Sequence, residues 1–121
     1  MRRSVLLIPA LALAGCATAT DRAGAASDVA TRFLAAAATD PAAACALLAP
    51  ETAASLDGAC ADALAAEDLP APGAVRRSRV YVDQAQVVLD TDTVFLAEFA
   101  GGWRVVAAGL ALVFTVAALH R

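Results

Sequence analysis

The residues best suited to chemistry in this 121-residue chain are its three cysteines, Cys16, Cys45 and Cys60. A cysteine can act as a nucleophile, bind a metal ion or form a disulfide. The single histidine, His120, is the next-to-last residue, where packing is not expected to hold it in place. We therefore expect no metal site and no cofactor, because no further thiol or nearby histidine completes a set of ligands.

Cys16 ends a segment with the anatomy of an export signal. A positive pair, Arg2 and Arg3, precedes a short apolar stretch that cannot span a bilayer as a helix. The following Leu13-Ala14-Gly15-Cys16 resembles the lipobox of bacterial lipoproteins, in which small residues admit the signal peptidase and the cysteine thiol is acylated. The resemblance implies that residues 1–15 are a removable signal peptide and that Cys16 carries lipid.

A second cleavage site remains open in the same segment. Ala17-Thr18-Ala19 has the small-x-small form of an ordinary secretory site, and cleavage after it would discard Cys16. We favour the lipoprotein, in which two or three acyl chains hold the protein stably on the membrane. The expected partner is then the lipid bilayer, and the expected location is the extracytoplasmic face of the cell membrane.

Composition argues against a nucleic-acid partner. The chain has 9 basic and 12 acidic residues, and loss of the leader removes two of the basic ones. Nucleic-acid binding needs a basic surface. Much of the 60% hydrophobic content is alanine, which buries little area and favours helix. We expect a small, alanine-rich globular domain.

The mature chain is predicted to begin with a flexible tether. Residues 16–26 comprise the lipidated cysteine and a small, polar stretch without apolar periodicity, which would lift the domain off the membrane. A single domain is expected over residues 27–121. Ser27 is a reasonable N-cap, and Val29, Phe33 and Ala37 recur every four residues, so a helix is predicted over about 28–39.

Shorter helices are predicted next. Asp40-Pro41 and Pro50-Glu51 each offer a start signal for a short helix, since proline fits the first helical turn. Gly58 separates the second of these from a further helical stretch over residues 60–67, with Leu64 facing inward. The prolines and glycine at 70–73 close this helical half.

After Gly73 the apolar period changes from about 3.6 to 2, which predicts strands. Breaks at 83–84, 90–92 and 100–102 are short enough for hairpin turns, and residues 103–109 form the predicted fourth strand. The predicted inward-facing residues are Val80, Val82, Ala85, Val87, Leu89, Phe95, Ala97 and Phe99. We expect an α+β fold, with N-terminal helices packed on a curved antiparallel sheet of about four strands.

This order of elements, ending in Gly-Gly-Trp-Arg-Val-Val at 101–106, resembles the nuclear-transport-factor-two-like or cystatin-like superfamily. That resemblance implies helices packed into the concave face of the sheet. Residues 29–108, with Ala44-Cys45-Ala46-Leu47-Leu48 and Cys60, are similar to small uncharacterised lipoproteins of actinobacteria. The likeness ends at an apolar tail, residues 110–121, expected to be a buried strand, an apolar helix or an altered gene end.

The pair Cys45 and Cys60 is expected to form a disulfide. An exported protein meets an oxidising environment, and these two thiols remain once Cys16 is acylated. The alternatives are two reduced, buried cysteines or a metal-binding pair, for which no other thiol or nearby histidine completes a set of ligands. The expected effect of such a bond is a cross-link between two neighbouring short helices.

Two further clusters of charge have both a functional and a structural explanation. Asp90-Thr91-Asp92, with Asp83, could collect calcium, although aspartates in turns usually cap those turns. The arginine cluster Arg76, Arg77 and Arg79 could contact anionic headgroups or a partner. Such a cluster at the start of a sheet more often forms a solvated edge that discourages strand pairing.

The favoured function is a non-catalytic, membrane-anchored domain that binds a partner or a small apolar molecule. The alternatives are a small cone-shaped enzyme that uses a carboxylate with Tyr81, and an envelope scaffold protein. Paired carboxylates, or a tyrosine with a carboxylate, would favour the enzyme, whereas an apolar lining would favour the binding domain.

Overall fold

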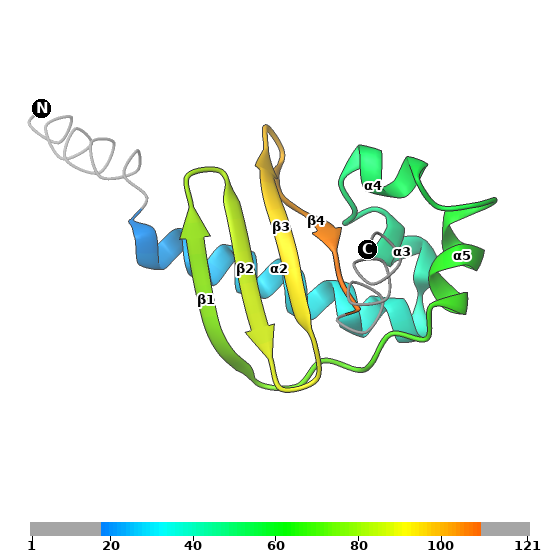
Figure 1. Ribbon diagram of the computed structural model, residues 1–121, viewed down its shortest axis with the longest axis horizontal. Coiled ribbons are helices and arrows are strands. Elements are labelled where there is room, and N and C mark those ends of the chain that lie inside the picture. Colours follow the sequence, from blue (N-terminus) through cyan, green and yellow to red (C-terminus); the bar gives the residue numbers. More distant parts are fainter. Residues whose placement is uncertain (1–17, 110–121) are drawn as a thin grey trace, which may run out of the picture.

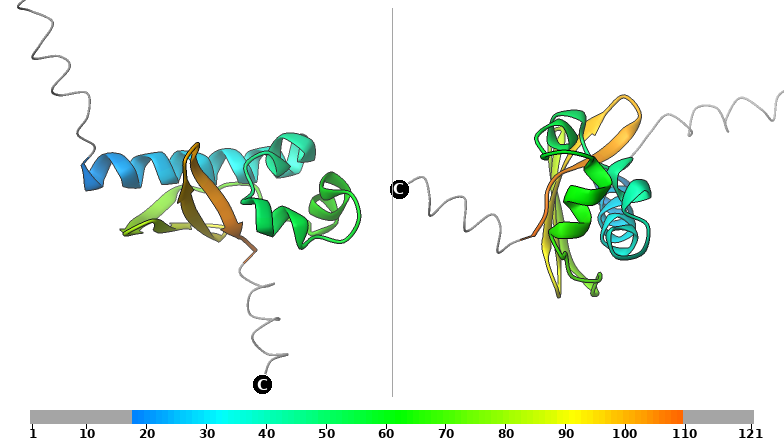
Figure 2. Two further views of the ribbon diagram at one scale, coloured as in Figure 1. Left: turned by 90° about the horizontal axis from the view of Figure 1, so that it is seen from above. Right: turned by 90° about the vertical axis from the view of Figure 1, so that its right-hand side faces the viewer.

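The computed structural model describes residues 18–109; the predicted signal peptide, Cys16 and the apolar tail 110–121 lie outside this range. Helices pack against an open antiparallel sheet of four strands, which confirms the predicted α+β class (Figure 1). One long helix, α2, crosses a single face of the sheet, and three short helices gather beside the last strand (Figure 2).

Helix α2, Ala19–Thr39, begins earlier than the sequence analysis predicted. The hydroxyl of Thr18 accepts a hydrogen bond from the Asp21 N–H, and the Asp21 carboxylate accepts one from the Thr18 N–H. This reciprocal pair is a capping box, which satisfies backbone donors at a helix start. The predicted helix start at Ser27 is therefore wrong, and the residues assigned to a flexible tether are helical from Ala19 onward.

One face of α2 forms half of the core. Val29, Phe33 and Ala37 are buried as predicted, and the larger set of buried residues recurs every three or four positions. The set is Ala26, Val29, Ala30, Phe33, Leu34 and Ala37. Its alanines allow the helix to approach the sheet closely. Within residues 18–109 no helix combines the length and apolar character that a membrane span requires.

The short helices are α3, Pro41–Cys45, α4, Pro50–Ala54, and α5, Cys60–Ala66. Helices α3 and α4 begin at the predicted prolines, and α5 follows Gly58 as predicted. Helix α3 ends at Cys45, earlier than the predicted end at Pro50. A disulfide joins α3 to α5, with the α-carbons of Cys45 and Cys60 6.2 Å apart, so the predicted pairing is confirmed. This distance lies within the usual range for such bonds.

The strands are β1, Val75–Tyr81, β2, Gln84–Leu89, β3, Thr93–Phe99, and β4, Gly102–Ala107. Each pairs with its neighbour in chain order, which confirms the predicted antiparallel meander. In β2 the predicted inward-facing residues are buried. The turns lie within a residue or two of their predicted places.

Two predicted inward-facing sets are wrong. In β3 the buried residues are Val94 and Leu96. The predicted residues were Phe95, Ala97 and Phe99. Successive apolar residues give no contrast between the two faces, so the alternation left the choice open. Val82, predicted to face the core, lies in the β1–β2 turn and is 86% exposed.

The two edge strands of the sheet, β4 and β1, have different surroundings. Residues 47–49 run beside β4, where the Ala49 N–H donates to the Val105 carbonyl and the Val105 N–H donates to the Leu47 carbonyl, each at 2.8 Å. At the other edge, β1 exposes the arginine cluster of residues 76, 77 and 79. Charged side chains on an edge strand discourage pairing with other chains.

Loss of the disulfide should lower the melting temperature by about 10 °C or more. With a sequence separation of 15, the chain-entropy argument gives about 3 kcal/mol. A domain of this size loses roughly 4 to 8 °C per kcal/mol. Thermal unfolding of the wild type with and without reductant measures the effect. In Cys45→Ser, reductant should cause no further drop, and a wild type insensitive to reductant would contradict the prediction.

Candidate functional site

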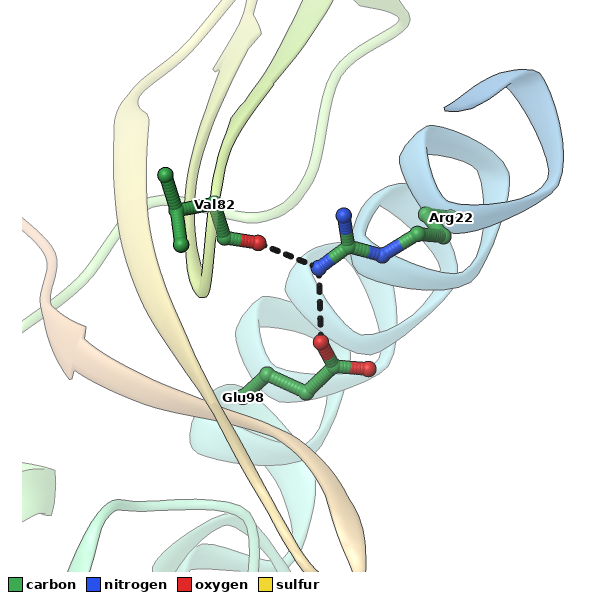
Figure 3. Close-up of polar contacts among 3 residues, drawn as sticks. All are labelled: Arg22, Val82 and Glu98. Atoms are coloured by element: carbon green, nitrogen blue, oxygen red, sulfur yellow. Dashed lines mark hydrogen bonds and ion pairs between the residues drawn. The ribbon is translucent and has the colours of Figure 1, made fainter. Parts of the chain in front are cut away.

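Arg22 joins the start of α2 to the sheet. Its guanidinium donates hydrogen bonds to the Val82 carbonyl and, at 2.7 Å, to the Glu98 carboxylate (Figure 3). The same group lies 5.6 Å from the centre of the Trp103 ring, in the range of a cation–π contact. The sequence analysis missed this cluster because it assigned Arg22 to the tether.

Further hydrogen bonds hold the same end of the molecule together. The Ser78 hydroxyl donates to the Ala23 carbonyl at 3.3 Å, and it contacts the Ser27 hydroxyl. The Glu98 N–H donates to the Asp83 carbonyl at 2.8 Å, which connects β3 to the β1–β2 turn. The first two turns of α2 are therefore fixed against the sheet.

Tyr81, the residue considered for an enzyme site, is 52% exposed at the end of β1. Its hydroxyl accepts a hydrogen bond from Arg79 at 3.4 Å. This bond raises the pKa of the Arg79 guanidinium above its ordinary value. Within residues 18–109 the hydrogen-bond partner of the Tyr81 hydroxyl is thus a cation rather than a carboxylate.

The aspartates considered for calcium lie at opposite ends of β2. Asp83 belongs to the β1–β2 turn, whereas Asp90 and Asp92 belong to the β2–β3 turn. Asp90 pairs instead with Arg76 at 3.4 Å. Residues 18–109 contain no group of three or more acidic, cysteine or histidine side chains arranged to hold a metal ion.

Asp92 has a structural role. It is only 4% exposed, and its two carboxylate oxygens accept hydrogen bonds from the N–H groups of Thr93, at 2.8 Å, and Gly109, at 2.7 Å. Its backbone carbonyl accepts another from Leu89 at 2.8 Å. Asp92 therefore closes the β2–β3 turn and fixes the backbone where the described chain ends.

The face of the sheet beneath α2 is apolar core. Its buried side chains, each 6% exposed or less, are Ala85, Val87, Leu89, Val94, Leu96, Trp103 and Val105. Within residues 18–109 the buried polar or charged residue is Asp92. The general acid and base of the enzyme alternative are thus not assembled on this face.

No protein-family model, curated protein or solved structure matches this chain. The resemblances to actinobacterial lipoproteins and to the cystatin-like superfamily therefore stay predictions.

Arg22→Met should destabilise the domain by about 1 to 2 kcal/mol. The substitution removes a partly exposed ion pair, a hydrogen bond to a carbonyl and a cation–π contact. Methionine matches arginine in helix propensity, so the helix itself is not penalised. Urea unfolding measures the change. Arg32→Met, at an exposed position of the same helix, is the control and should change stability by less than about 0.5 kcal/mol.

Asp92→Asn should cost about 2 kcal/mol, because an amide NH₂ would face a buried backbone N–H in place of an accepting oxygen. Asp90→Asn is the matched control in the same turn. Its side chain is 49% exposed and its ion pair is long, so we expect a change below about 0.5 kcal/mol. Equal effects of the two substitutions in urea unfolding would contradict this assignment.

Proposed function

We propose that this protein is a membrane-anchored, extracytoplasmic lipoprotein acylated on Cys16, whose domain is non-catalytic and binds a partner or a small ligand. The observation that carries the proposal is the position of the lipobox. Leu13-Ala14-Gly15-Cys16 ends two residues before the N-cap of α2, Thr18. Cleavage before Cys16 leaves the whole capping box on the mature protein.

The alternative cleavage site is less compatible with this fold. Cleavage after Ala19 would remove Thr18, whose hydroxyl caps α2 and whose N–H binds Asp21. Loss of such an N-cap typically costs about 1 kcal/mol. The cleavage that exposes Cys16 therefore suits the folded domain better than the ordinary secretory cleavage does.

The disulfide supports an extracytoplasmic location. Bonds such as Cys45–Cys60 persist in oxidising compartments and are rare in the cytosol, where thiols are kept reduced. An anchored domain outside the membrane meets this condition. The disulfide thus agrees with the export signal that the leader indicates.

A non-catalytic role agrees with the placement of the polar groups. The Tyr81 hydroxyl accepts a hydrogen bond from Arg79, and the Asp92 carboxylate accepts hydrogen bonds from backbone N–H groups. The remaining polar contacts described above hold turns and helix ends. These side chains therefore take part in contacts within the domain.

Cys16→Ser should abolish acylation, because serine lacks the thiol that accepts the diacylglyceryl group. Radiolabelled palmitate incorporation in bacterial cells measures the effect. Cys45→Ser is the control, since it removes a thiol without touching the lipobox, and it should retain the label. Persistent label in Cys16→Ser, or a mature N-terminus at Thr20, would contradict the lipoprotein proposal.

A further inference from the structure

We propose that the end of the domain formed by the start of α2 and the β1–β2 and β3–β4 turns contacts the bilayer directly, inserting Tyr81, Val82 and Phe99 into its interface. We call this end the anchor-side surface. The inference rests on acylation of Cys16. It adds an orientation and a second, non-covalent contact with lipid.

A very short stretch of chain joins the acylated Cys16 to the folded domain. Only Ala17 and Thr18 separate Cys16 from the first residue of α2, and Thr18 is already fixed in the capping box. Cys16 lies two residues before Thr18, and two residues span at most about 7 Å when fully extended. The acylated cysteine must lie at the membrane interface, so the start of α2 must lie close to it as well.

Arg22 also connects the start of α2 to two turns of the sheet, β1–β2 and β3–β4. Arg22, one turn into α2, contacts the carbonyl of Val82 in the β1–β2 turn and the side chain of Glu98 near the β3–β4 turn. In Figure 1 both turns lie at the upper edge of the sheet, and the start of α2 lies to the left of β1. Figure 2 also places the start of α2 and the β1–β2 turn at one end.

The exposed apolar side chains gather on this surface. Within residues 18–109, five large hydrophobic residues are exposed, and three of them lie here: Tyr81 at 52%, Val82 at 86% and Phe99 at 43%. Aromatic residues favour the membrane interface, where the ring is partly dehydrated and a hydroxyl stays hydrated. Tyr81 and Phe99 follow Val80 and Glu98, which face α2, so they project from the other face of the sheet. Their grouping at the turn end of the sheet fits a surface that meets lipid.

Val82 gives an independent indication that the β1–β2 turn contacts lipid. Its backbone has a φ of 57°, in the left-handed region that β-branched residues rarely adopt. A turn at this position favours asparagine or glycine in an aqueous loop. Val82 is unfavourable there both in its backbone conformation and in its exposure, and contact with lipid would compensate for the exposure.

The charges indicate an apolar rather than an electrostatic contact. The anchor-side surface carries three cationic side chains, Arg22, Arg79 and Arg104, the last of which lies beside Gly101 of the β3–β4 turn. It also carries the carboxylates of Asp21, Asp83 and Glu98. Three positive and three negative groups give no net attraction to anionic lipid. The contact should therefore depend little on lipid charge or on salt.

The test uses two matched tryptophan probes in the full chain. Val82→Trp lies on the anchor-side surface, and Val75→Trp, also at an exposed valine, lies at the opposite end of β1. Trp103 is present in both variants, so the difference between them reports the new positions. Each protein is purified from membranes, its N-terminal acylation is measured by mass spectrometry, and it is reconstituted into vesicles of brominated phosphatidylcholine, with and without phosphatidylglycerol.

We expect blue-shifted emission and several-fold stronger bromine quenching for Val82→Trp than for Val75→Trp, without any need for phosphatidylglycerol. Equal quenching in acylated protein would overturn the orientation and leave the lipoprotein proposal intact. Quenching that appears only with phosphatidylglycerol would overturn the apolar contact. Absence of the acyl group would overturn the lipoprotein proposal, and the orientation with it.

A second comparison separates lipid contact from folding. In a Phe99→Trp background, Val82→Asn should reduce the quenching of the new tryptophan while raising the melting temperature, because asparagine tolerates the left-handed turn. Val75→Asn is the control and should leave the quenching unchanged. A stabilised Val82→Asn protein with undiminished quenching would overturn the role assigned to Val82.

Discussion

The packing of α2 across a single face of the sheet is the interaction on which the other features depend. Phe33 and Leu34 are at most 1% exposed and lie in the same core as Val87 and Leu96 of the sheet. Burial of one such side chain contributes roughly 1.5 to 3 kcal/mol. A four-stranded sheet with one apolar face needs a second layer, and α2 provides it.

The same helix fixes the distance between the two ends of the molecule. With 21 residues, α2 is about 31 Å long. Arg22 fastens its start to the turns of the sheet, and its other end leads into the short helices joined by the disulfide.

Two charged residues hold the opposite ends of the sheet in similar ways. Arg22 binds a turn carbonyl, a carboxylate and an aromatic ring, while Asp92 accepts hydrogen bonds from a turn and from the backbone after β4. Each connects segments that are distant in the sequence. These contacts give Arg22 and Asp92 a structural role, although a charged residue of either kind could also be a candidate for catalysis or binding.

The sequence by itself determined the class of each element and the pairing order of the strands, because the change of apolar period and the turn residues are local signals. It also predicted the Cys45–Cys60 pair, because these are the two cysteines of residues 18–109. Tertiary structure decided where α2 begins and which face of β3 is buried. The docking of Arg22 is a long-range contact, and an unbroken apolar run in β3 fits either face until the helix covers one of them.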